Sequence, residues 1–78
     1  RLDVEPEIKL PVTAVLPETY VPEPMRRLAF YQRMAQSVTD EEIFDVLGEI
    51  EDRYGHAPAE AHHLAEVMVI RRRLRARP

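Results

Sequence analysis

Four carboxylates and a glycine in the segment 40–54 are the residues of this sequence best suited to recognise another molecule. At about 100° per residue they share one side of a helical wheel, opposite the apolar residues of the segment. This acidic face consists of Glu41, Asp45, Gly48, Glu49 and Asp52. Like charges four residues apart cost a few tenths of a kcal/mol, and a glycine inside a helix costs about 1 kcal/mol relative to alanine. Helix stability alone therefore does not account for this face.

The acidic face has two interpretations. In the first it is a solvated surface that aids solubility. In the second it is a docking surface, where arginines of a partner bond to the carboxylates and the small Gly48 lets the partner approach the helix backbone. Under the second interpretation, partner binding is expected at Asp45, Gly48, Glu49 and Asp52.

Catalysis and metal binding find little support in the other polar residues. His62 and His63 diverge by about 100° on a helix, and His62 with Glu66 has helical spacing but no third ligand. The sequence holds no cysteine, no glycine-rich phosphate loop and no nucleophile with a matching base. We therefore expect no enzyme activity, no metal and no cofactor.

Five arginines near the end of the sequence suggest an alternative function. They are Arg71, Arg72, Arg73, Arg75 and Arg77. Such a cluster can bind the phosphate backbone of a nucleic acid. No aromatic residues are interleaved with it, and residues 1–70 carry 6 basic and 14 acidic side chains, a net charge of −8. A nucleic-acid-contacting accessory module is therefore the second interpretation.

Three helices must position these residues, and we predict them at 24–37, 39–54 and 58–75. Pro24 suits a first helical position, Thr39 and Glu42 form a capping box, and Gly55 supplies a left-handed stop. The predicted core stripes, in helix order, are Met25, Leu28, Tyr31, Met34, Ala35 and Val38; Ile43, Val46, Leu47, Ile50 and Tyr54; and Ala61, Leu64, Ala65 and Met68. Arg27 shares the apolar side of the first helix, so we expect it to pair with a carboxylate.

Residues 1–23 are predicted to form an extended arm, because five of the seven prolines lie within the first 24 residues. Ile8, Leu10, Val12 and Ala14 alternate with polar residues, while Pro11 removes a ladder donor, so an edge strand is expected here. The 78 residues leave room for one domain. The predicted fold is α+β, mainly α, with the arm packed on three helices, and the absence of a long apolar run favours a cytoplasmic location.

The third predicted helix carries a second stripe on a different side. It begins at His63 and runs through the apolar residues Val67, Ile70 and Leu74. One helix of a three-helix domain needs only one buried face. The stripe therefore indicates a self-association surface or a contact with chain beyond Pro78, and the alternative is that these are scattered surface aliphatic residues.

Three motifs together resemble one known family. They are Pro17-Glu18-Thr19-Tyr20-Val21-Pro22, Arg27-Leu28-Ala29-Phe30-Tyr31, and Glu49-Ile50-Glu51-Asp52-Arg53-Tyr54-Gly55-His56-Ala57-Pro58. Their order and spacing are similar to the C-terminal domain of bacterial transcription-repair coupling factors, over residues 6–75. The resemblance marks six residues as motif positions: Arg27, Tyr31, Arg53, Tyr54, Gly55 and Pro58. Tyr54 and Ile50 depart mildly from the family, which usually has Phe and Leu there.

The resemblance implies a regulatory module of an ATP-driven DNA translocase whose motor lies in other domains. In the family this domain docks on a UvrB-like module of the same protein and masks the surface that binds the repair protein UvrA. Glu49 and Asp52 match the carboxylates that face arginines of that module. Contact with RNA polymerase would be indirect, and contact with nucleic acid would come only through the parent protein. Family members continue past the third helix, so this chain resembles a fragment of the domain.

Overall fold

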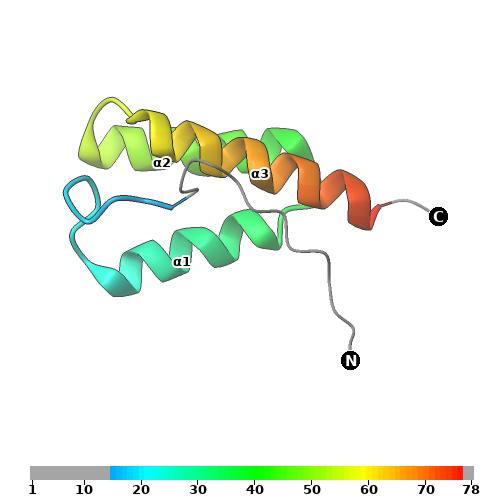
Figure 1. Cartoon of the computed structure of the whole chain (residues 1–78), viewed down its shortest axis with the longest axis horizontal. Helices are drawn as coiled ribbons and strands as arrows, with labels where there is room; N and C mark the ends of the chain where they lie inside the picture. Colours follow the sequence, from blue (N-terminus) through cyan, green and yellow to red (C-terminus); the bar gives the residue numbers. More distant parts are fainter. Residues whose placement is uncertain (1–14, 77–78) are drawn as a thin grey trace.

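A computed structural model describes residues 15–76, which form three helices (Figure 1). They are α1 (Pro24–Ala35), α2 (Asp40–Tyr54) and α3 (Ala59–Arg75). Residues 15–76 contain no strand, so the described part of the fold is all-α. The predicted edge strand at Ile8, Leu10, Val12 and Ala14 lies outside the described residues. None of the three helices is long and apolar enough to cross a membrane.

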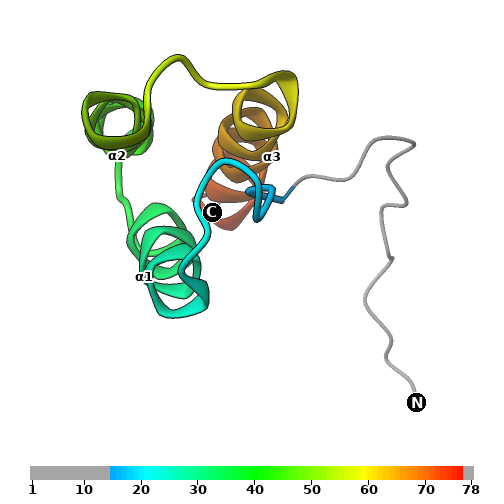
Figure 2. The ribbon, with the colours of Figure 1, turned by 90° about the vertical axis from the view of Figure 1, so that its left-hand side faces the viewer.

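The three helices lie at the corners of a triangle, with residues 15–23 against α1 and α3 (Figure 2). Figure 1 shows α2 running antiparallel to α1 and α3, as the short connections 36–39 and 55–58 require. The core is filled from all three helices and from Leu16 and Val21 of the arm. Among its residues, Val21, Ile43, Ile50, Ala61 and Ala65 are fully inaccessible to solvent.

The predicted stripes of α2 and α3 are confirmed. Ile43, Val46, Leu47 and Ile50 are buried on α2, with Tyr54 packed beside them, and the four predicted core residues of α3 are buried as well. These stripes are predictable because each follows a single 3.6-residue period without interruption.

The predicted stripe of α1 is wrong in three of its six residues. Met25, Leu28 and Val38 are 73%, 46% and 71% exposed. The other three, Tyr31, Met34 and Ala35, face the core, together with Phe30, which the predicted stripe left out. Arg27 lies toward this side of the helix and binds the arm through the carbonyl of Val21.

The ends of the helices differ in detail from the predictions. α1 ends at Ala35, two residues early, and the hydroxyl of the buried Ser37 donates to the carbonyl of Arg33 at 2.9 Å. Thr39 accepts from the amide of Glu42 as predicted, but the Glu42 carboxylate reaches the amide of Val38. Gly55 stops α2 with φ 94° and ψ −171°, a glycine-favouring conformation outside the expected left-handed helical region.

Candidate docking surface

The acidic face lies on the solvent side of α2. Glu41, Asp45, Glu49 and Asp52 are all exposed, and Gly48 lies half-buried among them. A Cβ atom built on Gly48 would meet nothing within 4 Å, so no neighbouring side chain requires a glycine at this position. The sequence-based placement of these five residues on one open side is therefore what the structure shows.

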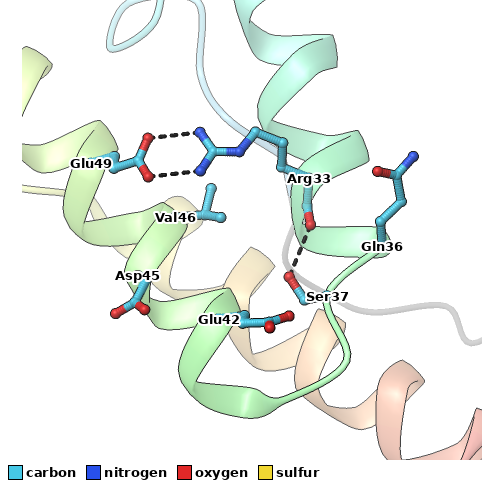
Figure 3. Close-up of a pocket in the computed structure, with 7 residues that line it drawn as sticks. All are labelled: Arg33, Gln36, Ser37, Glu42, Asp45, Val46 and Glu49. Atoms are coloured by element: carbon cyan, nitrogen blue, oxygen red, sulfur yellow. Dashed lines mark hydrogen bonds and ion pairs between the residues drawn. The ribbon is translucent and has the colours of Figure 1, made fainter.

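Arg33 of α1 reaches across to this face and binds Glu49 through a two-point ion pair (Figure 3). Its Nη1 donates to Oε1 at 2.7 Å, and its Nη2 donates to Oε2 at 2.7 Å. Both side chains stay about half exposed, at 47% and 53%. The hydrogen bonds from the guanidinium lower the pKa of Glu49 below its ordinary value. Glu49 is thus ionised and already partnered in the isolated chain.

A pocket of about 350 Å³ opens beside this ion pair, between the last turn of α1 and the first half of α2. Figure 3 shows the residues around it. They are Arg33, Gln36, Ser37, Glu42, Asp45, Val46 and Glu49. Three carboxylates and one guanidinium line the pocket, so it has a negative balance that favours a positively charged group. No cluster of three or more metal-ligating residues occurs within residues 15–76.

The arm meets the end of α2 through two tyrosines. Tyr20 and Tyr54 pack with ring centroids 5.9 Å apart and planes inclined at 58°. The Tyr20 hydroxyl donates to the carbonyl of Gly55 at 2.5 Å, and the Tyr54 hydroxyl donates to Oε1 of Glu23 at 2.8 Å. Burial raises the pKa of both phenols, and their neighbours Glu51 and Glu23 add to it. The family motifs around Tyr20 and Tyr54 therefore bind each other within the fold.

Other motif residues also hold the arm and the α2–α3 turn. Arg27 donates to the backbone carbonyls of Val21 and Pro22 at 2.8 and 3.2 Å, and among residues 15–76 it does not form the expected pair with a carboxylate. Backbone carbonyls satisfy a guanidinium equally well and leave no pattern in a sequence. The Tyr31 hydroxyl accepts from the amide of Leu16 at 2.8 Å.

The motif residues at the turn have similar structural roles. The Arg53 guanidinium lies 6.0 Å from the centre of the Tyr54 ring. Pro58 is the N-cap of α3, which begins at Ala59, one residue later than predicted. Together with Gly55, these residues shape the connection between α2 and α3.

Two members of the arginine cluster are bound to α2. Arg72 and Arg73 both donate to Asp40, with shortest nitrogen–oxygen distances of 2.7 and 2.6 Å. Arg72 also donates to the carbonyl of Val38 at 3.2 Å. Hydrogen bonds from Arg73 and Arg72 lower the pKa of Asp40. Arg71 and Arg75 are exposed, and Arg77 lies outside the described residues. The cluster is thus partly engaged within the fold, which weakens the nucleic-acid alternative.

The second stripe of α3 is partly open to solvent. Val67 is half-buried, and Ile70 and Leu74 are 52% and 53% exposed. Self-association through these residues remains a prediction.

Arg33 is the residue of this surface that sequence analysis missed. Its only sequence signal is a single cation in the last turn of a helix that precedes an acidic helix. Which carboxylate it meets depends on how α1 and α2 cross, and no local spacing encodes that crossing.

Comparison with known proteins identifies relatives of one kind. The TRCF domain family matches residues 10–77. The transcription-repair-coupling factor of Myxococcus xanthus is 38% identical over 71 residues, which make up 91% of this chain and 6% of that protein. Those of Mycobacterium tuberculosis and Escherichia coli are 42% identical over 64 residues and 32% identical over 65 residues. These matches cover 82% and 83% of this chain, but only 5% and 6% of those proteins.

A solved structure shows the same arrangement. The crystal structure of a C-terminal domain of transcription-repair coupling factor superposes with a TM-score of 0.77 at 25% identity. The match covers 87% of this chain and 42% of the solved chain. The chain therefore spans about 6% of the curated relatives and less than half of this solved domain.

Proposed function

Because this chain belongs to the TRCF domain family of transcription-repair-coupling factors, we propose that it is a regulatory interaction module of a transcription-coupled repair protein. The family model covers residues 10–77, which are too few to include a translocase motor, so we assign the motor activity of the relatives to other parts of those proteins. In this proposal the acidic face docks on a UvrB-like module of the parent protein. Docking masks the surface that binds UvrA, and release exposes it.

The observation that carries the proposal is the exposure of the acidic face. Four carboxylates share the solvent side of α2, and within residues 15–76 only Glu49 of the four forms an ion pair with a cation. The motif residues Tyr20, Tyr54 and Gly55 are used inside the fold, whereas Asp52, from the same motif, is exposed. A motif carboxylate without an evident structural role favours an external one. The basic surface expected of a partner would complement this face.

The test is the double substitution Glu49→Ala and Asp52→Ala. We expect the affinity for a purified UvrB-like module to fall by about 30-fold or more, the loss typical of removing a partly desolvated ion pair. The thermal midpoint of the isolated chain should change little, because both side chains lie on the solvent side of α2. In the full-length parent protein the same change should raise the affinity for UvrA by shifting the equilibrium toward the released state.

A matched control removes two exposed carboxylates elsewhere, with Glu18→Ala and Glu66→Ala. This control loses the same charge but keeps the acidic face, so its docking affinity should stay close to that of the unmodified chain. Equal weakening in both variants would reduce the effect to net charge, and unchanged docking in the first variant would refute the proposal. Binding to duplex DNA that falls steeply with added salt would favour the arginine-cluster alternative.

A further inference from the structure

The ion pair between Arg33 and Glu49 occupies the carboxylate that the proposed docking would use. The guanidinium approaches end-on, with one nitrogen on each oxygen at 2.7 Å. A partner arginine that seeks the same two-point geometry finds both oxygens taken. Only one arginine can hold this end-on position, so a partner arginine takes it only by displacing Arg33.

Another carboxylate of α2 is shared by two arginines. Asp40 accepts from two arginines at once, with Arg72 on Oδ1 and Arg73 on Oδ2. Each arginine holds one oxygen, and the carboxylate is only 28% exposed. At Glu49 a single arginine holds the end-on position on both oxygens, so a second guanidinium gains that position only after Arg33 leaves.

The surroundings make the departure of Arg33 easy. Its pair with Glu49 is about half exposed, and surface ion pairs of this kind contribute little to stability. Asp45 lies one helical turn before Glu49 and lines the same pocket as Arg33 (Figure 3). The other nearby carboxylate, Glu42, accepts from the amide of Val38 at 2.8 Å. Figure 3 shows the Asp45 carboxylate directed away from Arg33, so a displaced guanidinium turns to solvent.

We propose that Arg33 is an internal competitor for the cation of the partner. In the free chain it pairs with Glu49, and on docking a guanidinium of the partner replaces it while Arg33 turns to solvent. Docking then requires an exchange of ion pairs, which lowers the affinity and keeps the contact reversible. This inference rests on the proposed function, because it concerns the same carboxylate.

The test compares Arg33→Gln with Arg71→Gln for binding to the purified UvrB-like module. Both substitutions remove one exposed positive charge, but only the first frees Glu49. We expect Arg33→Gln to tighten docking about two- to fivefold relative to Arg71→Gln, the range that corresponds to an exposed ion pair. Circular dichroism would verify that both variants are folded. Equal or weaker docking of Arg33→Gln would overturn the competition.

The substitution Glu49→Gln separates this inference from the proposed function. If Glu49→Gln weakens docking, and Arg33→Gln tightens docking by itself but has no effect in the Glu49→Gln background, both proposals are supported. If Glu49→Gln weakens docking but Arg33→Gln alone does not tighten it, only the competition fails. If Glu49→Gln leaves docking unchanged, docking through Glu49 and competition for it both fail.

Discussion

The two faces of α2 differ in what holds their residues in place. The inner face carries Ile43, Val46, Leu47 and Ile50, with exposed fractions of 0–5%. The outer face carries carboxylates that repel one another and a glycine with open space around it. Burial of apolar surface stabilises the inner face at about 25 cal/mol per Å², whereas like charges one turn apart destabilise the outer face.

This difference separates residues that specify the fold from residues that remain available for another task. The inner face is needed for the three helices to pack. The outer face stabilises the helix little, and its one cross-helix contact is an exposed ion pair to α1. A helix can therefore tolerate a costly outer face when its inner face is complete.

The largest effect is expected from breaking the inner face with Ile50→Ala. Ile50 is fully buried, and truncating such a side chain typically costs about 2–5 kcal/mol of unfolding free energy. That is a large share of the stability of a small domain. Urea denaturation would measure it, with Asp52→Ala as the neighbouring outer-face control. Similar midpoints for the two variants would contradict the assignment of the faces.

The two glycines, Gly48 on the outer face of α2 and Gly55 after its end, should respond to substitution by alanine with opposite changes in stability. Gly55→Ala should destabilise the chain by about 1–3 kcal/mol, because φ at Gly55 is 94°. Gly48→Ala should stabilise it by up to about 1 kcal/mol, because Gly48 is helical and a new Cβ meets no atom within 4 Å. Thermal unfolding of both variants provides the measurement. A destabilised Gly48→Ala would show that the outer face is more constrained than its geometry indicates.

The smallest effect is expected from acid. Arginine hydrogen bonds lower the pKa of Glu49 and of Asp40 in the folded chain. A lowered folded pKa contributes stability that is present above the unfolded pKa and is lost as the pH falls through the folded value. Stability should therefore decline below about pH 5. Glu49→Gln and Asp40→Asn should each flatten this decline, whereas Ile50→Ala should lower the whole curve without changing its shape. Identical acid profiles for all variants would argue against these ion pairs in solution.

Sequence periodicity was sufficient to locate the helices and the inner face of α2. Ile43, Val46, Leu47 and Ile50 follow one uninterrupted stripe, and Thr39 marks the start of the helix through a local hydrogen bond. The open position of the acidic face follows from the same wheel, because it lies opposite a complete stripe. These features are local, and local spacing encodes them.

Contacts between elements were not predictable in this way. The bonds from the arm to Arg27 and Tyr31 of α1 join segments that share no period. The pairing of Arg33 with Glu49 depends on the crossing of two helices, and that of Arg72 with Asp40 spans 32 positions. Several carboxylates were available to each arginine, and only the packed core decides among them.

The contact between the arm and the helices can be followed by the intrinsic tyrosine fluorescence of the chain. The sequence has no tryptophan and three tyrosines, so tyrosine dominates its intrinsic fluorescence. All three lie at this contact: Tyr20 is in the arm, Tyr31 binds the amide of Leu16, and Tyr54 donates to Glu23. A phenol that donates to a carboxylate has a ready proton acceptor when excited. Release of residues 16–23 from the helices would therefore change the tyrosine emission of the unlabelled chain.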